Sequence, residues 1–425
     1  MSRRRWLLGG VLAGVALVIA AVAIRLPPRG APEPIHAAAA SRAEPGDLAA
    51  RGQYLTRAGN CMACHTARGG EPWAGGRGIE TPFGTVYAGN LTPHATGLGA
   101  WTADDFWQAL HFGRSRDGRL LYPAFPYTHY TRVARSDVDA MFGFLRTLPP
   151  VDRPNTPHAL RWPFSTQWAL AAWRMLYFTP GPHVDDPTRS MEWNRGAYLV
   201  QGLGHCSACH SSRNALGASE VLDLSGGVIP MQAWYAPSLA APEEASVAPW
   251  PVEAIAHWLA TGSSDRASAL GPMAEVILHS TQHLHPADLR AMAVFLKAVP
   301  PAPPVRVNRP PATTQVLERG RRLYEAHCID CHGRQGEGVA GAYPPLAGNR
   351  AVTLPVTSNL VQVVIHGGFA PATAGNPRPF GMPPFALVLS DAEVAAVLTY
   401  LRNAWGHQAG AVSELDVAQQ RSLRQ

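Results

Sequence analysis

The sequence predicts a mainly α-helical protein, in which three tandem domains of one design follow an N-terminal transmembrane helix. Three observations carry this prediction: a Cys-x-x-Cys-His run occurs three times, two similar helices bracket each run, and an uncharged apolar stretch lies close to the N-terminus. The composition agrees, because 46% hydrophobic and 16% charged residues over 425 positions are typical of a folded chain with about two to four domains.

The repeated motif uses all six cysteines of the chain and predicts its cofactor. The three runs are Cys61-Met-Ala-Cys64-His65, Cys206-Ser-Ala-Cys209-His210 and Cys328-Ile-Asp-Cys331-His332. Two thiols at this spacing form thioethers to both vinyl groups of a haem, and the adjacent imidazole becomes the proximal iron ligand. We therefore expect three covalently bound haem c groups, with His65, His210 and His332 as axial ligands. Paired zinc knuckles are the alternative, but a zinc ribbon has no role for a His directly after each pair.

A similar helix precedes each motif, and another closes each unit. The opening segments are Arg51-Gly-Gln-Tyr54-Leu55, Arg195-Gly-Ala-Tyr198-Leu199 and Arg319-Gly-Arg-Arg-Leu323-Tyr324, and the closing segments are 137–146, 288–297 and 393–402. The closing segments share aromatic and apolar positions at helical spacing, so we expect residues such as Phe144 and Leu145 in the core. Ser136 and Ser390 are the expected N-caps. Opening and closing helices packed across each other, with haem between them, form the class I cytochrome c fold.

Proline-rich segments separate the units. We expect a membrane anchor or signal segment at 1–25, a Pro/Ala-rich tether at 26–46, cytochrome c domains at 47–150, 193–300 and 315–406, an aromatic-rich linker at 151–192, a Pro-rich linker at 301–314 and a polar tail at 407–425. The aromatic-rich linker carries Trp162, Trp168 and Trp173. Packing across two adjacent domains is its favoured role, and contact with a partner subunit or the membrane interface is the alternative.

The N-terminus indicates export. The run from Trp6 to Ile24 is uncharged, and its 19 residues would span roughly 28 Å as a helix, about one hydrocarbon core. Three arginines before it favour a cytoplasmic flank, which places the rest of the chain on the periplasmic side of a bacterial inner membrane. A cleaved signal peptide is the alternative, because Ala37 to Ala40 offers small residues for cleavage.

The net charge does not indicate a nucleic-acid partner. The chain carries a formal charge of +6, and three of its positive charges are the arginines beside the apolar run. Three haems would add about six propionate charges, which nearly cancel this excess. We therefore expect no nucleic acid among the partners.

Two methionines occupy the position of a sixth iron ligand. Met273 lies in Gly271-Pro-Met-Ala-Glu275 and Met382 in Gly381-Met-Pro-Pro-Phe385, each between a motif and the closing helix of its unit. A Met opposite the proximal His raises the haem potential and closes the iron to small ligands. We expect Met273 and Met382 to ligate the second and third haems.

The first unit departs from this pattern. It has Phe125 where the third unit has Met382, and a phenyl ring cannot bind iron. His129, four residues further on, is the nearest candidate ligand, whereas His94 and His111 lie well before this loop. His/His ligation would lower the potential of this haem, so that electrons run from haem one outward. A five-coordinate first haem is the alternative, which would make the chain a peroxidase or small-ligand sensor, recognisable by a high-spin spectrum.

The chain resembles the three-haem cytochrome c subunits of bacterial membrane-associated periplasmic dehydrogenases. The matching segments include Thr81-Pro-Phe-Gly84, Asn90-Leu-Thr-Pro93, Gly99-Ala-Trp101-Thr102, Gly271-Pro-Met-Ala-Glu275, Ser280-Thr-Gln-His283-Leu284 and Tyr343-Pro-Pro-Leu-Ala-Gly-Asn349. The resemblance implies that the chain is not an enzyme by itself but takes electrons from a catalytic subunit and passes them to ubiquinone or a terminal oxidase. The chain shows no nucleotide or hydrolase signature of its own.

The resemblance leaves the catalytic partner open among three classes. These are a quinoprotein alcohol dehydrogenase with pyrroloquinoline quinone, an FAD-dependent gluconate or sugar dehydrogenase, and a molybdenum hydroxylase that acts on aldehydes or N-heterocycles. Subunits of the first two classes usually carry Met where this chain has Phe125. The chain is more similar to the molybdenum-hydroxylase branch in three features: a Phe with a downstream His, an insertion at 161–181 and an N-terminal anchor.

Overall fold

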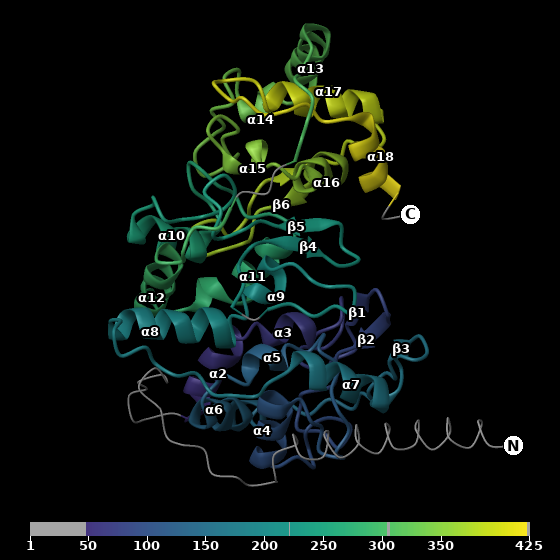
Figure 1. The fold of residues 1–425 in the computed structure, drawn as a ribbon, viewed down its shortest axis with the longest axis vertical. Coiled ribbons are helices and arrows are strands. Elements are labelled where there is room, and N and C mark those ends of the chain that lie inside the picture. The colour runs from purple at the N-terminus through teal and green to yellow at the C-terminus, as the bar shows by residue number, and fades with distance from the viewer. Residues whose placement is uncertain (1–47, 221, 304–306, 423–425) are drawn as a thin grey trace, which may run out of the picture.

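The computed structural model describes residues 48–220, 222–303 and 307–422, and in these ranges the chain is mainly helical, as predicted (Figure 1). Three small antiparallel sheets accompany the helices there. The elements form three successive units, numbered one to three in chain order, and each unit contains one Cys-x-x-Cys-His run. The predicted membrane helix lies outside the described residues. No helix within them has both the length and the apolar character needed to cross a bilayer.

Unit one is a helical domain with a small hairpin at its side. Its helices are α2 (Leu48–Ala58), α3 (Cys61–Cys64), α4 (Ala103–Phe112), α5 (Tyr127–Tyr130) and α6 (Arg135–Leu145), and its strands are β1 (Gly78–Thr81) and β2 (Gly84–Tyr87). Strand β3 (Ala159–Leu160), from the following segment, extends the hairpin to a sheet of order β1-β2-β3. Thr102 and Asp105 form a capping box at the start of α4.

Helix α7 (Gln167–Tyr177) lies between units one and two and contacts both. Arg174 Nη2 donates to the carbonyl of Phe112 in unit one at 2.6 Å, and Trp173 Nε1 donates to the carbonyl of Leu216 in unit two at 2.8 Å. The aromatic-rich segment therefore packs across two units. Trp162 and Trp168 nevertheless remain exposed.

In Figure 1 unit one lies at the bottom, unit two above it and unit three at the top. Unit two contains α8 (Met191–Tyr198), the π-helical turn η1 (Leu199–Leu203), α9 (Ser207–His210), β4 (Gly227–Ile229), β5 (Trp234–Ala236), α10 (Val252–Thr261), α11 (Pro272–His279), the 3-10 turn η2 (Thr281–His283) and α12 (Pro286–Lys297). Unit three contains α13 (Thr314–His327), α14 (Ile329–His332), α15 (Arg350–Thr353), α16 (Ser358–His366), β6 (Gly368–Phe369), β7 (Gly381–Met382), α17 (Asp391–Leu401) and α18 (Glu414–Ser422).

The opening and closing helices of each unit pack across each other: α2 on α6, α8 on α12, and α13 on α17. One glycine permits each crossing. A Cβ atom at Gly52, Gly196 or Gly320 would overlap a backbone carbonyl of the closing helix. The three glycines follow the arginines that begin the three opening segments, so the repeat seen in the sequence is a repeated helix crossing in the structure.

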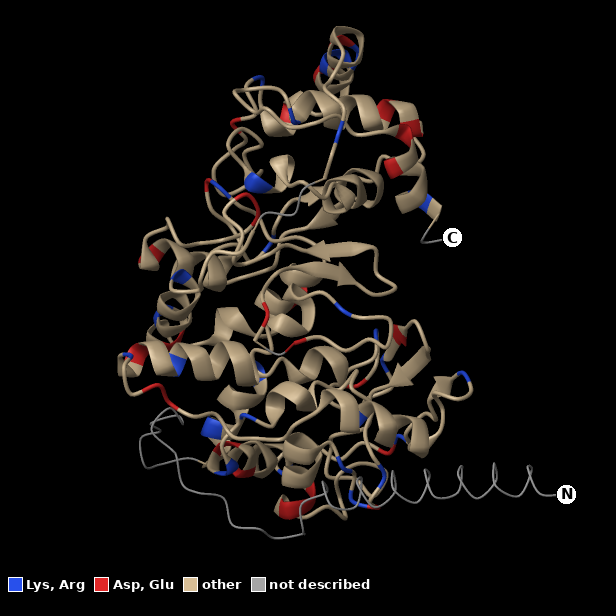
Figure 2. Cartoon of the chain, viewed as in Figure 1, with Lys and Arg blue, Asp and Glu red and all other residues tan. Residues whose placement is uncertain are grey.

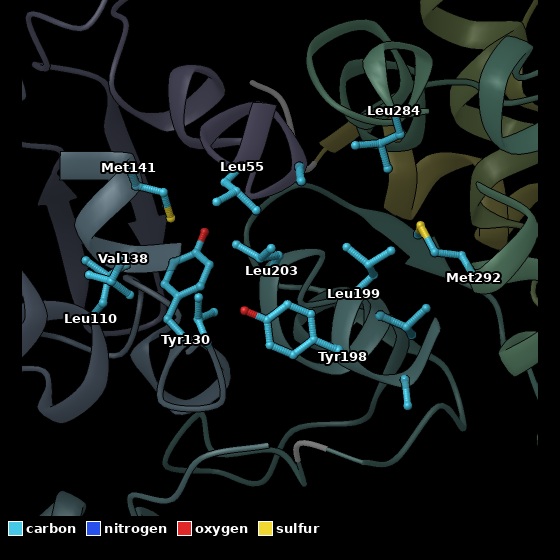
Figure 3. Close-up of a cluster of buried hydrophobic side chains, with 14 of the residues drawn as sticks. Leu55, Leu110, Tyr130, Val138, Met141, Tyr198, Leu199, Leu203, Leu284 and Met292 are labelled. Carbon is cyan, nitrogen blue, oxygen red and sulfur yellow. The ribbon is translucent and has the colours of Figure 1, made fainter. Parts of the chain in front are cut away.

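The hydrophobic core is divided unequally among the units. A single cluster of buried side chains runs through units one and two. Figure 3 shows Leu55 of unit one beside Leu203 of unit two, with Met141 of unit one on one side of this pair and Leu199 and Met292 of unit two on the other. Unit three has its own cluster, around α13, α16 and α17. Units one and two therefore fold around a common core, whereas the core of unit three is separate.

Equivalent tyrosines of units one and two each form a hydrogen bond with the other unit. Tyr54 of α2 donates its hydroxyl proton to Asp288 Oδ2 of unit two at 2.5 Å, and Tyr198 of α8 donates to Asp137 Oδ2 of unit one at 2.6 Å. The two tyrosines occupy the same position in their opening segments, so the contact is reciprocal.

The third unit cannot form this tyrosine hydrogen bond. It carries Arg322 at the tyrosine position, and Arg322 pairs with Glu318 on its own helix. It joins unit two by other contacts. The side chain of Asn359 forms two hydrogen bonds with the backbone of Tyr235, at 2.7 and 2.8 Å, and Arg350 Nη1 donates to the carbonyl of Ser246 at 2.5 Å.

One of the two predicted helix caps is confirmed and the other is wrong. Ser390 caps α17 through a capping box with Glu393. Ser136 instead lies inside α6, whose N-cap is Ala134. The physical reason is where the helix begins: α6 starts at Arg135, so Ser136 stands at its second position, where its side chain cannot serve as the N-cap. The N–H of the N-cap residue Ala134 donates to the Tyr198 hydroxyl of unit two at 3.1 Å.

Candidate functional site

Each Cys-x-x-Cys-His run forms a short helical turn directly after the opening helix of its unit, in α3, α9 and α14. The following His is held by a backbone carbonyl. Nδ1 of His65 lies 2.7 Å from the Gly89 oxygen, that of His210 lies 2.7 Å from the Pro237 oxygen, and that of His332 lies 3.0 Å from the Pro344 oxygen. A carbonyl can only accept, so each Nδ1 carries the proton. The lone pair of Nε2 is then available to iron.

The protonation state of these rings suits ligation. Burial lowers the pKa of His65, of His210 and of His332, while the hydrogen bond to the carbonyl opposes this shift. All three imidazoles are therefore neutral near pH 7, and a metal ligand must be neutral imidazole.

The cysteines are not arranged for other thiol chemistry. All six are free of disulfides, and burial raises the pKa of Cys61 and of Cys206 to about 12 and that of Cys328 to about 11. Thiols that stay protonated at neutral pH are poor nucleophiles. No group of three or more His, Cys, Asp or Glu side chains suited to a metal ion occurs in the described ranges. Two thiols and one oriented imidazole per motif fit covalent haem c.

The predicted methionine ligands lie in well-defined elements. Met382 is in strand β7 and packs against the same apolar cluster as Cys328 of the third motif. Met273 lies in the first turn of α11, after Gly271, whose φ of 54° favours glycine. Helix α11 also contacts α3 of unit one. Both ligand assignments stay predictions.

In unit one, Phe125 packs against the common core together with Cys61, as Met382 does with Cys328 in unit three. Phe125 also lies 5.5 Å, between ring centroids, from Tyr130. The structure thus gives an aromatic ring to the position that holds a methionine in the third unit.

His129 is directed to the second motif. Its Nε2 lies 2.9 Å from the hydroxyl oxygen of Ser207, which stands between Cys206 and Cys209, and its Nδ1 lies 3.2 Å from the Thr128 hydroxyl. Burial lowers the pKa of His129 to about 3, and nearby charged groups add to this effect. The neutral ring lies at the boundary of units one and two, and its assignment to the first haem stays a prediction.

The two other histidines considered for this role have partners elsewhere. His94 Nδ1 lies 2.9 Å from the Thr96 hydroxyl and 3.5 Å from a carboxylate oxygen of Asp152. His111 stacks on Trp107 with ring centroids 4.3 Å apart, and burial lowers the pKa of His111 to about 4.

The contact between the first two motifs contains residues that the sequence did not single out. The Gly59 carbonyl, two residues before Cys61, accepts a hydrogen bond from the Tyr130 hydroxyl at 2.8 Å, and the rings of Tyr130 and His205 lie 5.6 Å apart between centroids. His205 immediately precedes Cys206 and has a φ of 37°. Its place directly before the motif was the only signal in the sequence. These contacts bring the first two attachment motifs together.

Charged residues of both signs are scattered over the surface in the view of Figure 2, without a broad face of one sign. Many of them pair with each other, such as Arg290 with Glu192 and Arg135 with Asp104.

Comparisons with known proteins agree with the geometry of the motifs. The cytochrome c family model matches residues 317–405. The chain is 37% identical over 398 residues to the cytochrome c subunit of a quinone alcohol dehydrogenase from Gluconacetobacter polyoxogenes, covering 88% of this chain and 84% of that protein. It is 34% identical to the gluconate 2-dehydrogenase cytochrome c subunit of Pantoea cypripedii, covering 87% and 89%.

A third relative is larger. The chain is 39% identical over 362 residues to one of the subunits of nicotinate dehydrogenase from Pseudomonas putida, covering 83% of this chain and 30% of that protein. The similarity to these relatives extends over 83–88% of this chain. The chain therefore belongs to the family of cytochrome c subunits of dehydrogenases, which carry covalent haem c and transfer electrons for a catalytic subunit.

Proposed function

We propose that the chain is a three-haem electron relay, with one haem c in each unit. The observation that carries this proposal is the same hydrogen bond, from the proximal His Nδ1 to a backbone carbonyl, at all three motifs. When bound, haem supplies one-electron storage at each site. The family model matches only the third unit, but the crossing of opening and closing helices is shared by all three.

The residues of the chain have separate tasks in this relay. His65, His210 and His332 hold the irons, the six cysteines fix the porphyrins, and Met273 and Met382 close the second and third sites to other ligands. The common core of units one and two fixes the relative position of the first two haems. Asn359 and Arg350 attach the third unit to unit two and so set the distance of the last transfer.

The catalytic partner that we favour is a molybdenum hydroxylase acting on aldehydes or N-heterocycles. Phe125 in place of a methionine and the α7 insertion support this choice. The relative from nicotinate dehydrogenase also supports it, because nicotinate is an N-heterocycle. An alcohol dehydrogenase with pyrroloquinoline quinone, or a gluconate or sugar dehydrogenase with FAD, comes next. The electrons pass to ubiquinone or a terminal oxidase.

The proposed location is the periplasmic side of the bacterial inner membrane. The apolar run from Trp6 to Ile24 supports a retained anchor, and the requirement of c-type haem attachment for export supports the periplasm. Intact-mass measurement of the mature chain tests the anchor, because loss of the residues before about Ser41 would contradict it.

Gentle affinity purification of the full chain tests the proposed function. We expect three haems per chain by pyridine haemochrome assay, and a co-purified catalytic protein that contains molybdopterin. Pyrroloquinoline quinone or flavin in that protein would replace the favoured partner by one of the others. Fewer than three haems in the fully matured protein would contradict the three-haem relay.

A further inference from the structure

The peptide group that holds each proximal histidine has a different hydrogen-bond partner in each unit. The carbonyl of this peptide group accepts a hydrogen bond from the histidine Nδ1–H. The N–H of the same peptide group belongs to the next residue in the chain. In unit two, this N–H belongs to Ser238 and donates to Glu244 Oε2 at 2.7 Å. In unit one, it belongs to Asn90 and donates to Asn155 Oδ1, a neutral amide oxygen, at 2.7 Å. In unit three the next residue is Pro345, which has no N–H.

Glu244 is a buried acid with a defined role in this contact. Its side chain is 0% exposed. Oε2 accepts from the Ser238 N–H and from the Tyr235 hydroxyl, the latter at 2.8 Å. Burial, and next the neighbouring Glu244, raise the pKa of Tyr235, so this hydroxyl stays a donor. Oε1 is buried and has no hydrogen-bond partner among the described residues, so both donors lie on Oε2. Two donors on one oxygen therefore suit a carboxylate anion.

A carboxylate at this place acts on His210 through the peptide group. Hydrogen bonds in a chain polarise one another, so a negative charge on the Ser238 N–H side increases the electron density on the Pro237 oxygen. A stronger acceptor draws the Nδ1 proton of His210 and makes the imidazole a stronger electron donor to iron. More donation stabilises ferric over ferrous haem and lowers the reduction potential. Nδ1 lies 2.7 Å from the carbonyl oxygen at His210 and at His65, where the peptide N–H has a partner, and 3.0 Å at His332, where Pro345 supplies no N–H.

We propose that Glu244 is a positioning residue that lowers the potential of the second haem below that of the third. This inference rests on the proposed function, because it needs a haem in both units. The two haems have the same predicted axial ligands, His and Met, so ligand identity does not separate them. The contrast between Glu244 in unit two and Pro345 in unit three separates their potentials. A lower potential of the second haem favours electron transfer from it to the third haem, which gives the last step of the relay a direction.

Glu244→Gln in the full-length haem-loaded chain is the test. Gln retains an oxygen that accepts from Ser238 and Tyr235 but removes the charge. Spectroelectrochemical titration should show one of the three reduction waves shifted to higher potential and the other two unmoved. In the ferrous protein, the Nδ1–H proton resonance of one haem-ligating histidine should move upfield as its hydrogen bond weakens. Glu243→Gln is the matched control, because it removes an exposed neighbouring charge that contacts no such peptide.

Asn155→Asp tests the converse in unit one. Asn155 is exposed, so the substitution leaves the core intact, and its new carboxylate should lower one reduction wave. This variant keeps the inference testable if Glu244→Gln fails to mature. Unmoved waves in Glu244→Gln, or equal shifts in Glu243→Gln, would overturn the inference, as would an unmoved wave in Asn155→Asp. Pyridine haemochrome assay separates the two levels: fewer than three haems contradicts the relay, whereas three haems with unmoved waves contradicts only the role of Glu244.

Discussion

At the scale of single residues, the local parts of the site were predictable and the distant parts were not. The cysteines and proximal histidines stand together in the sequence, so their spacing alone predicts them as the residues that hold haem. The residues that bind the peptide groups behind these histidines are distant in the sequence. Asn155 lies 65 positions from Asn90, whose N–H it accepts. The position of His129 shows the same limit, because its neighbour Ser207 belongs to another unit.

Replacement of Met382 by Ala should convert one low-spin haem to high spin, because the iron loses its sixth ligand. The same result is expected for Met273→Ala in the second haem. The absorption band of the Met-to-iron bond should disappear for one haem in each variant. Met292→Leu is the control, since Met292 is a buried core residue of the closing helix α12. Unchanged spectra in either Ala variant would refute that ligand assignment.

Replacement of His129 by Ala distinguishes two roles for the ring. As a ligand of the first haem, its loss should change the spectrum of that haem alone. If the first haem keeps its spectrum, His129 serves the contact with Ser207 instead, and the sixth position is open or is filled by another side chain. Electron paramagnetic resonance of the ferric protein separates low-spin from high-spin signals in these variants.

The ion pair of Arg195 with Asp288 should make stability depend on acid pH. Burial alone would raise the pKa of Asp288, but Arg195 and Tyr54 lower it below its usual value of 3.8. A lowered pKa adds stability that is complete above about pH 4 and is lost as pH falls through the folded-state value. Urea unfolding between about pH 2 and 5 should show this loss, and Asp288→Asn should lack it. Asp265→Asn is the control, as the Asp265 side chain is 83% exposed; an equal change there would contradict the assignment.

At the scale of elements, helical periodicity located the closing helices closely. Segments expected from 137, 288 and 393 begin two residues earlier, at Arg135, Pro286 and Asp391. The sequence could not show which helix end meets another unit. Ala134, the N-cap of α6, is an example: its N–H donates to the Tyr198 hydroxyl of unit two, and the expected cap Ser136 stands inside the helix. Local patterns therefore predict helices better than their ends.

The glycine at each helix crossing should be intolerant of any side chain. In Gly196→Ala, the new Cβ would overlap the carbonyl of Ala291 and force α8 away from α12. We expect a loss of about 1–3 kcal/mol in the free energy of unfolding. Gly143→Ala in α6 is the matched control, because its nearest neighbour is a Leu48 side-chain carbon at an ordinary 3.6 Å. That variant should be neutral or gain up to about 1 kcal/mol. Equal effects of the two variants, measured by chemical denaturation, would contradict the argument.

At the scale of the whole molecule, the three similar sequence repeats did not predict how the units pack against one another. Units one and two share one apolar core and form reciprocal hydrogen bonds through Tyr54 and Tyr198, while the third unit carries Arg322 at this position. The sequence difference was present, but its meaning depends on a partner residue in another unit. Units one and two are thus a pair with a common core, and the third unit, with a core of its own, joins unit two through contacts that include Asn359 and Arg350, an arrangement that suits the proposed relay.

Separate cores predict separate unfolding. Leu203 lies in the core of units one and two and Leu398 in that of unit three, and each side chain is 0% exposed. Either Leu→Ala substitution should cost about 2–5 kcal/mol of local stability, because it leaves a cavity. Differential scanning calorimetry of the full haem-loaded chain should resolve two transitions. Leu203→Ala should lower the midpoint of one and Leu398→Ala that of the other. If both substitutions lower one common transition, the polar contacts of Asn359 and Arg350 couple all three units into a single cooperative fold, and the division into a pair and an attached unit is wrong.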